Sequence, residues 1–549
     1  MTELLIEFLP VAMFLCLFAL FLTGYQITFA LMATGIIFGL IAVAVGALDI
    51  GVFAGIPENI WGQVMMNDTL LAIPFFTLMG LILERCGLAE DLLETIAKLF
   101  GPIRGGLAYA VILVGSILAA TTGIVAASVM AMGLIALPIM LRYGYDRELS
   151  TGTIAASGTL AQIVPPSLVL IVLADQLGRS VGDMYMGAML PSLLLIGLYC
   201  GYIFITSLIS PEKLPPAQNS FSPSLQHRQI VIASLPIFLL LFYGAFLLFS
   251  PEKAVLFSIT DTSYDQLIIW IFVLIGLIAI PLFYNLKGQK ELSDILRHLM
   301  ATIIPPVILI FLVLGTIFQG LATPTEAGAA GAIGALILAI CKKRLSFSLL
   351  KEALEKTAKL STFVMFILIG ARIFTLTFYH LEGHELIESL FGHIPGGAIG
   401  FLIIVNIMIF LLAFFLDFFE LVFILVPLLA PIATKLGIDL VWFGVILGLN
   451  LQTSFLTPPF GFSLFFLRSV TPDKDYTDKI TGQIIGKITT TQIYKGVLPY
   501  IVIQLIMVAL VIAFPELTYI DTAQELDMSL IDKQLPILPP LTDPVTRLF

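Results

Sequence analysis

The sequence predicts an all-α, polytopic membrane protein, and three features carry this prediction. Hydrophobic residues make up 59% of the 549 residues and charged residues only 12%, whereas soluble domains carry about 25% charged residues. The mean hydropathy is +1.05. The apolar residues gather in segments long enough to cross a hydrocarbon core of roughly 30 Å, and we expect about 12 membrane-spanning helices.

The expected helices follow one another along the chain with short polar connections, none of which could hold a soluble domain. They are 4–23, 27–48, 70–85, 148–180, 184–208, 229–249, 265–285, 299–320, 325–341, 359–378, 440–469 and 495–514.

Two further apolar blocks, 105–141 and 396–434, are too long for one crossing. As a single helix each block would be longer than about 50 Å, at 1.5 Å per residue. Each block must therefore fold back on itself, either as two crossings or as a re-entrant hairpin. Its two ends emerge on the same side in both cases. We expect re-entrant hairpins.

The distribution of Lys and Arg predicts the orientation in the membrane. With the 86–104 connection in the cytoplasm and alternation outward from it, 21 of the 27 basic residues fall on the cytoplasmic side, as the positive-inside rule requires. Both termini are then expected in the periplasm. The six exceptions are Arg179, Lys253, Arg372, Lys435, Lys533 and Arg547.

An internal repeat is visible in the sequence. The segment 99–106 resembles 390–397 at an offset of 291, and five later residues recur at an offset of 293. These are Pro138, Gly144, Asp146, Pro165 and Pro166, which recur as Pro431, Gly437, Asp439, Pro458 and Pro459. An odd number of expected crossings separates the copies, so the second copy is inverted. Inverted repeats with interrupted helices are typical of secondary transporters, which bind their cargo near mid-membrane.

Each repeat contains a Pro-Pro pair inside a polar stretch, which breaks the helix and frees backbone carbonyls. Within a membrane, such carbonyls are tolerated only inside protein or along a cavity. Together with nearby side-chain oxygens they are hard ligands that suit Na⁺. The alternative is a plain proline kink. The Na⁺ candidates are Ser157, Gly158, Pro165 and Ser167 at the first break, and Asn450, Thr453, Thr457 and Gly461 at the second; Gln162, Gln452 and Ser454 are substrate candidates.

The middle of each long block is the expected apex of its hairpin. The first apex is small and hydroxylated, and Thr121, Thr122, Gly123 and Ser128 are Na⁺ candidates. The second carries two acids in an apolar run, of which Asp417 is a Na⁺ candidate and Glu420 a substrate candidate. An acid at the membrane centre costs on the order of 3 kcal/mol. The alternative is that both cap the N-terminus of the second arm.

Two other polar features are open to more than one interpretation. Arg372 lies in an apolar span, where it could bind a substrate carboxylate, extend to the interface or pair with Asp417 or Glu420. The run from Thr323 to Glu326 is interpreted as the start of a helix. The chain contains no nucleotide-binding loop and no hydrolase motif, so no enzyme activity, cofactor or nucleic-acid partner is expected.

Six motifs in this order resemble the large membrane subunit of tripartite ATP-independent periplasmic (TRAP) transporters, over about residues 1–514. They are Leu71-Ala-Ile-Pro-Phe-Phe, Gly105-Gly-Leu-Ala, Gly144-Tyr-Asp, Val164-Pro-Pro-Ser, Thr323-Pro-Thr-Glu-Ala-Gly and Leu456-Thr-Pro-Pro-Phe-Gly.

The resemblance implies a bacterial inner-membrane protein with an elevator mechanism driven by a Na⁺ gradient. A periplasmic binding protein would deliver an organic anion, and a separate small membrane subunit of about four helices would complete the scaffold. Each hairpin apex would form a Na⁺ site with the break of its own repeat. Many members have Ser-Gly-Ser at the first apex where this chain has Thr121-Thr-Gly-Ile124, so one hydroxyl ligand is missing or comes from Ser128.

The resemblance also implies an organisation of the chain into six parts. These are scaffold helices at 1–69, the first repeat at 70–208, an inserted helix pair within 209–298, scaffold helices and an arm at 299–358, the second repeat at 359–469, and a loop, last helix and tail at 470–549. A self-sufficient Na⁺/dicarboxylate symporter of related architecture remains the alternative function, and it would need neither partner. An intramembrane enzyme or structural subunit has no supporting constellation.

Overall fold

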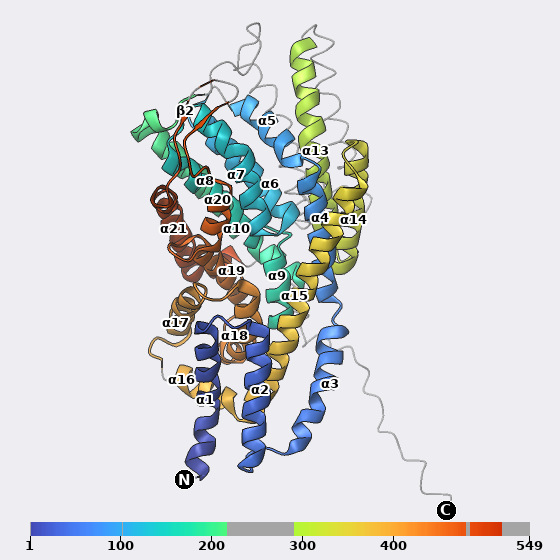
Figure 1. Cartoon of the computed structure of the whole chain (residues 1–549), viewed down its shortest axis with the longest axis vertical. Coiled ribbons are helices and arrows are strands. Elements are labelled where there is room, and N and C mark those ends of the chain that lie inside the picture. Colours follow the sequence, from blue (N-terminus) through green and yellow to red (C-terminus); the bar gives the residue numbers. More distant parts are fainter. Residues whose placement is uncertain are drawn as a thin grey trace, which may run out of the picture.

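The computed structural model describes residues 2–100, 103–216, 290–392, 394–478, 482 and 484–518, and this part is almost entirely helical (Figure 1). The predicted spans 229–249 and 265–285 lie outside the described residues, as does the tail that follows Thr518.

The first two helices follow the prediction closely, whereas the segment after them does not. Helices α1 and α2 match the expected spans, but the stretch before α4 is helical where the sequence predicted a connection. The segment Ile50–Met65 is bent by 52° relative to the segment Thr69–Arg85 that follows it. The elements are α1 (Thr2–Leu22), α2 (Ile27–Ala44), η1 (Ile50–Ala54), α3 (Gly55–Asn59), the π-helix η2 (Ile60–Met65), η3 (Thr69–Leu71) and α4 (Ala72–Arg85).

The first repeat continues with a short helix, a two-helix hairpin, a broken helix and a long helix. The short helix buries one face, on which Leu88, Leu92 and Ile96 recur every four residues. The elements are α5 (Leu88–Phe100), α6 (Gly106–Thr122), α7 (Val125–Arg142), α8 (Arg147–Thr159), η4 (Leu160–Gln162), α9 (Leu168–Leu177), α10 (Val181–Ile209) and η5 (Pro211–Lys213).

The second repeat has the same series of elements in the same order. A small antiparallel ribbon of β1 and β2 precedes its last helix. The elements are α16 (Gly383–Gly392), α17 (Gly397–Leu412), α18 (Phe418–Lys435), α19 (Leu440–Leu456), α20 (Phe462–Val470), β1 (Tyr476–Thr477), β2 (Ile484–Ile485), α21 (Thr490–Ala513) and η7 (Pro515–Leu517).

Helices α13 (Lys290–Phe318) and α14 (Pro324–Cys341) lie between the two repeats, and α15 (Phe347–His380) contains the predicted first span of the second repeat. A capping box between Thr323 and Glu326 begins α14, which confirms the predicted helix start. Helix α15 begins well before the predicted span at 359–378, because its first turns are rich in Leu, Lys, Glu and Ala, which favour helix.

Eight described helices are long and apolar enough to cross a membrane, or nine if the bent pair Ile50–Met65 and Thr69–Arg85 is one span. The count of about 12 stays a prediction. It includes two spans outside the described residues and two broken helices whose halves are each too short to cross alone. Each long apolar block does fold back as two helices, but the depth of these hairpins in a membrane also stays a prediction.

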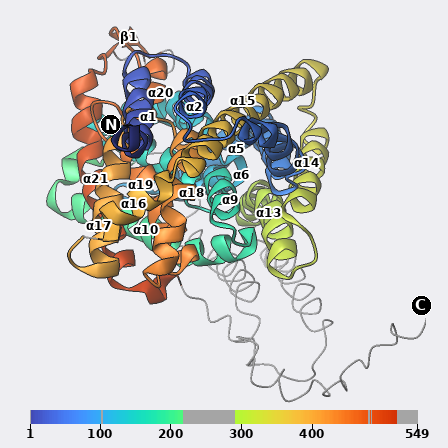
Figure 2. The ribbon, with the colours of Figure 1, turned by 90° about the horizontal axis from the view of Figure 1, so that it is seen from below.

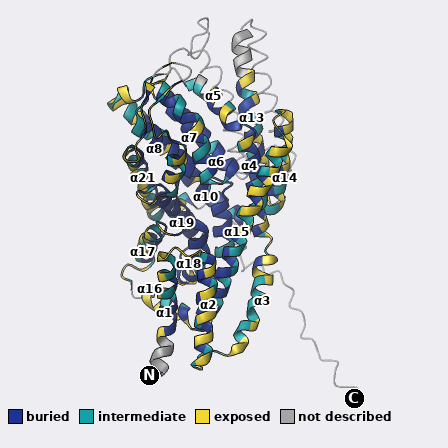
Figure 3. Ribbon diagram, viewed as in Figure 1, coloured by how far each residue is buried: buried dark blue, intermediate teal, exposed yellow. Residues whose placement is uncertain are grey.

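The two broken helices lie in the centre of the molecule. Every residue from Leu149 to Gln162 is buried, as is every residue from Trp442 to Leu456 (Figure 3). Seen from below, α17, α19 and α21 group on one side of the molecule and α13 and α14 on the other (Figure 2). Exposed apolar side chains such as Leu193, Phe204 and Ile337 lie on the outside, where they can meet lipid.

Basic residues pair with acids at the end of the molecule that carries α5 and β2 (Figure 1). Arg142 binds Asp478 at 3.0 Å, and Lys342 binds Asp91 at 2.6 Å. Each pair joins segments that are distant in the sequence. Their side chains are only 8 to 27% exposed, and the two pairs position the connections that they join.

Candidate ion and substrate site

The first helix break is closed by its own polar groups. Helix α8 ends at Thr159 and α9 begins at Leu168. The Ser167 hydroxyl donates to the Gln162 carbonyl at 2.7 Å, and the Tyr185 hydroxyl donates to the Ser167 carbonyl at 3.3 Å. A hydroxyl that donates keeps its lone pairs. The Ser167 oxygen can therefore still bind a cation.

The first hairpin apex lies directly on this break. A Cβ atom at Gly123 would lie 3.3 Å from the Leu168 nitrogen and 3.7 Å from the Pro166 carbonyl oxygen. The residue has a φ of +60°, which favours glycine. The hydroxyls of Thr122 and Ser128 are 2.9 Å apart, so Ser128 lies at the first apex, and its role as an ion ligand stays a prediction.

Small residues let the first hairpin approach its neighbours. A Cβ atom at Gly80 of α4 would lie 2.5 Å from the Thr122 Cα atom. A Cβ atom at Gly115 of α6 would lie 2.6 Å from the Ser157 Cβ atom, and one at Gly158 of α8 would collide with Val129 of α7. The apex is therefore enclosed by α4, α8 and the break, as close packing between membrane helices requires.

The second helix break has the same construction. Helix α19 ends at Leu456 and α20 begins at Phe462. The Ser463 hydroxyl donates to the Phe455 carbonyl at 2.7 Å, and the Thr457 hydroxyl donates to the Thr453 carbonyl at 2.8 Å. The peptide bonds Pro165–Pro166 and Pro458–Pro459 are both cis. The two breaks are thus alike in backbone and in the use of hydroxyls.

The second hairpin apex contacts the second helix break through aromatic rings. The rings of Phe414 and Phe415 are centred 6.1 and 5.6 Å from that of Phe460, which follows the Pro-Pro pair. Asp417 accepts from the Phe418 N–H at 2.7 Å, and Glu420 accepts from the Asp417 N–H at 2.8 Å. The two acids therefore form a capping box for α18. This confirms the alternative prediction that both acids cap the N-terminus of the second hairpin arm. Ion binding by Asp417 stays a prediction.

The sequence predicted Asn450 as a site residue but gave no prediction for Asn406, its partner under the second apex. The Asn450 side chain on α19 donates to the Asn406 carbonyl on α17 at 2.8 Å. The Asn406 Oδ1 atom is buried without a partner. At the repeat offsets, the equivalents of Asn406 and Asn450 are Gly115 and Ser157, which also touch. A single Asn inside the apolar block 396–434 was the available signal.

Within the described residues, no hydrogen bond or ion pair joins the predicted substrate residues to one another, so their role stays a prediction. Both polar atoms of the Gln162 amide are buried without a partner. The Ser454 hydroxyl donates to the Asn450 carbonyl of its own helix at 3.1 Å. Arg372 forms no ion pair with Asp417 or Glu420 in the described part of the chain. Its Nε atom is buried without a partner.

The remaining Na⁺ candidates donate within their own helices. Thr121 donates to the Leu118 carbonyl at 3.0 Å, Ser157 to Ile154 at 3.0 Å and Thr453 to Leu449 at 2.9 Å. Gly461 closes the second break, since its N–H donates to the Thr457 carbonyl at 2.9 Å. Their oxygens keep lone pairs, so hydrogen bonding to the helix is compatible with ion binding.

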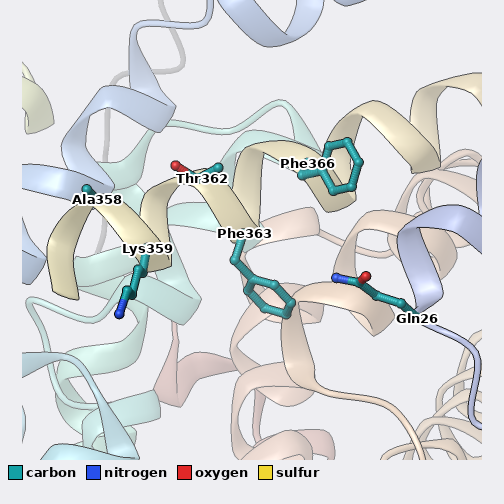
Figure 4. A pocket seen from close by; sticks show the side chains of 6 residues that line it. All are labelled: Gln26, Ala358, Lys359, Thr362, Phe363 and Phe366. Carbon is teal, nitrogen blue, oxygen red and sulfur yellow. The ribbon is translucent and has the colours of Figure 1, made fainter. Parts of the chain in front are cut away.

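A pocket of about 420 Å³ lies elsewhere, between α15 and the residue before α2 (Figure 4). None of its residues belongs to a hairpin or a broken helix. Its lining consists of Gln26, Ala358, Lys359, Thr362, Phe363 and Phe366.

The comparison with protein families decides the identity. Residues 14–517 match the family described as "Tripartite ATP-independent periplasmic transporter, DctM component". The chain belongs to this family. It is therefore a large membrane subunit of a TRAP transporter, a multi-pass inner-membrane protein and not an enzyme.

Several curated relatives span nearly the same length as this TRAP large subunit. It is 28% identical to the C4-dicarboxylate TRAP transporter large permease protein DctM of Pseudomonas aeruginosa, over 86% of this chain and 91% of the relative. It is 26% identical to the sialic acid TRAP transporter large permease protein SiaM of Vibrio cholerae, over 88% and 93%. It is 23% identical to the 2,3-diketo-L-gulonate TRAP transporter large permease protein YiaN of Escherichia coli, over 84% and 88%.

The fold also has a likeness among solved structures. The YdaH transporter of Alcanivorax borkumensis superposes with a TM-score of 0.51 over 86% of this chain and 90% of that one. The sequence identity is 13%, so the likeness concerns the fold alone.

Proposed function

We propose that this TRAP large subunit carries a small organic anion into the cell by Na⁺-coupled transport with an elevator mechanism. The observation that carries the proposal is the pairing of each hairpin apex with the break of its own repeat. Gly123 lies on the Pro166–Leu168 segment, and Phe414 and Phe415 lie on Phe460.

The chemistry of the breaks favours a hard monovalent cation. Their side-chain oxygens come mainly from Ser, Thr and Asn, and the two acids at the second apex, Asp417 and Glu420, each already accept a backbone N–H. Oxygen ligands suit hard cations, and interrupted helices in transporters hold coupling ions with freed carbonyls. One Na⁺ site would use Thr121, Thr122, Gly123, Ser128 and the first break; the other would use Asp417, Asn450, Thr453, Thr457 and Gly461.

The expected cargo is a small carboxylate, because the relatives are named for C4-dicarboxylates, sialic acid and 2,3-diketo-L-gulonate. A periplasmic binding protein and a small membrane subunit of about four helices are the expected partners, since the family is tripartite. Both termini of the large subunit are expected in the periplasm, with the paired basic residues around Arg142 and Lys342 facing the cytoplasm.

Uptake into proteoliposomes tests the proposal. The large subunit is reconstituted with and without its small subunit and binding protein, and a radiolabelled C4-dicarboxylate is offered under an imposed Na⁺ gradient. We expect uptake only with both partners and with Na⁺. Uptake that persists in choline, at fixed pH and membrane potential, contradicts Na⁺ coupling. High-affinity uptake by the large subunit alone would instead favour a self-sufficient symporter.

A further inference from the structure

The pocket of about 420 Å³ beside α15 lies on the outer face of that helix (Figure 4). The inner face is packed against the protein, where Thr357 and Val364 are 7% and 1% exposed. On the outer face, Lys359 and Phe363 line the pocket and are exposed. The two-sided pattern is typical of a helix at the edge of a packed core. The pocket is therefore separate from the buried helix breaks and from the hairpin apices.

Close packing between α2 and α15 closes one end of the pocket. A Cβ atom at Gly370 would lie 2.9 Å from the Thr28 carbonyl oxygen. Next to this contact, the rings of Phe29 and Phe366 meet edge to face with their centres 5.4 Å apart. Helix α2 begins here, whereas α15 continues past it toward its own start at Phe347. Lys359 precedes Phe366 by seven residues, so it lies about 10 Å along the helix from the aromatic end.

The polar side chains of the pocket have no partner of their own. Its polar residues form no side-chain hydrogen bond or ion pair among the residues that the structure describes; they are Gln26, Lys359 and Thr362. The acid one turn before Lys359 is Glu355, which instead lies 3.9 Å from Lys351. No acidic side chain lines the pocket. One free ammonium beside an amide and a hydroxyl favours an anion that accepts hydrogen bonds.

The pocket lies at the level where a membrane helix pair meets water. The connection between the apolar helices α1 and α2 ends at Gln26, and its Tyr25 is 67% exposed. Tyr is enriched at membrane–water interfaces. From this level, the exposed side chains of Phe29, Ile36 and Leu40 form a stripe along α2. Its 11 residues extend over about 16 Å, which is close to half of a hydrocarbon core of roughly 30 Å.

We propose that this pocket binds an anionic phospholipid of the surrounding bilayer. The phosphate group lies against Lys359, Gln26 and Thr362, and an acyl chain follows Phe363 and the stripe that begins at Phe29. A free anion would gain nothing from the aromatic end or from the stripe. Basic pockets between membrane helices on the cytoplasmic side bind such headgroups, and the expected orientation places this pocket in the cytoplasmic leaflet. The site goes beyond the proposed transport function and does not depend on its coupling ion or cargo.

Photo-crosslinking of the assembled membrane complex tests the proposal. The large and small subunits are reconstituted in phosphatidylcholine vesicles that contain a trace of phosphatidylglycerol with a diazirine in its acyl chain. After illumination, mass spectrometry maps the crosslinked peptides. We expect crosslinks within 358–366 and 26–40. Unlabelled phosphatidylglycerol should suppress them about fivefold more effectively than added phosphatidylcholine, which corresponds to about 1 kcal/mol for one surface Lys at 1.4 kcal/mol per decade.

Matched lysine variants assign this preference to one side chain. Lys359→Gln should remove the fivefold preference, and Lys359→Arg should keep it. The control is Lys356→Gln, which removes the same charge one turn earlier from a lysine that lies 3.4 Å from Glu352 and outside the pocket. It should also keep the preference. Because both lysines are exposed, neither change should impair folding. An unchanged preference in Lys359→Gln overturns the proposal.

Three results with the wild-type complex would also overturn it. Equal suppression by the two lipids would show that the pocket does not recognise charge. Suppression by inorganic phosphate as strong as that by phosphatidylglycerol would show a site for a free anion. Absence of crosslinks in the pocket would show that a protein segment covers it. Such a result beside Na⁺-dependent uptake refutes this inference alone, whereas an intact preference beside uptake that persists in choline refutes the coupling proposal alone.

Discussion

Removal of single hydroxyl groups at the helix breaks tests the ion-binding hypothesis most directly. Ser167→Ala and Thr457→Ala each remove one oxygen that already donates to a nearby carbonyl. Losing a buried polar contact costs about 1–3 kcal/mol. We expect the Na⁺ concentration for half-maximal uptake to rise roughly 5- to 150-fold, at about 1.4 kcal/mol per decade.

The control for these variants is Ser192→Ala, which removes a buried hydroxyl that donates within α10 to the Met189 carbonyl at 2.8 Å. It should leave the Na⁺ dependence unchanged. Wild-type Na⁺ dependence in Ser167→Ala and Thr457→Ala, with normal expression, would leave the two breaks as proline kinks.

Asp417 offers a way to separate helix capping from ion binding. Asn caps a helix about as well as Asp, so Asp417→Asn keeps the cap of α18 and removes the charge. We expect a melting temperature near that of the wild type and weaker Na⁺ dependence of uptake. Asp417→Ala should remove both the helix cap and the charge. The loss of the cap alone should lower the free energy of unfolding by about 0.5–2 kcal/mol. Unchanged Na⁺ dependence in Asp417→Asn would restrict the residue to capping.

Sequence reasoning identified side chains at the breaks but not their partners. Thr457 and Ser167 were found because a Pro-Pro pair marks a local break in the chain. The pairs Asn406–Asn450 and Tyr199–Gln504 join segments 44 and 305 residues apart, which no local pattern connects. Arg372 shows the same limit, since its apolar surroundings in the sequence did not reveal that its Nε atom would be buried without a hydrogen-bond partner among the described residues.

At the scale of elements, the crossing of α8 and α21 depends on two glycines in contact. A Cβ atom at Gly152 would collide with the Gly496 carbonyl, and one at Gly496 would collide with Glu148. Gly152→Ala should therefore separate the helices that carry Thr159 and Gln504. Overpacking of this kind typically costs about 1–3 kcal/mol.

A thermal melt of the purified subunit measures this effect, with Gly201→Ala as the control. Gly201 lies within α10, and a Cβ atom there meets nothing within 4 Å. Its replacement should be neutral or slightly stabilising, because Ala favours helix over Gly. Equal melting temperatures for the two variants would mean that the helices can part without cost.

Element boundaries were predictable wherever length or proline decided them. The blocks 105–141 and 396–434 had to fold back because they are too long, and the structure turns them at Gly123 and before Asp417. The helical segment 50–65 was missed because its Gly, Pro and Asn residues resemble a loop. Its turns include a 3-10 and a π segment, in which packing overrides local propensity.

At the scale of the whole molecule, the described residues combine a repeated series of helices with a basic end. The repeat could be recognised from Gly and Pro residues, since these fix the backbone at the hairpins and breaks. The pairing of Arg142 with Asp478 and of Lys342 with Asp91 could not, because each acid lies far along the chain from its base. The two ion pairs bring the segments around α5, α8, α15 and the start of α21 together at the basic end.

Cysteine labelling of intact cells tests the orientation of this whole arrangement. The four native cysteines, Cys16, Cys86, Cys200 and Cys341, are first replaced by Ala. Ser348→Cys then places an exposed thiol at the basic end, and Ser389→Cys places one at the opposite end on α16. Both changes are nearly isosteric.

A membrane-impermeant maleimide should label the cysteine at position 389 in intact spheroplasts and the one at position 348 only after permeabilisation, because the basic end faces the cytoplasm. Thr122→Cys reports on the first hairpin. Thr122 is 2% exposed and is covered by α4 at Gly80, so its replacement should resist labelling from the periplasm. Rapid labelling of this position from the periplasm in every condition would show that the hairpin crosses the membrane. Labelling at position 348 in intact cells would invert the topology and, with it, the side from which each apex is reached.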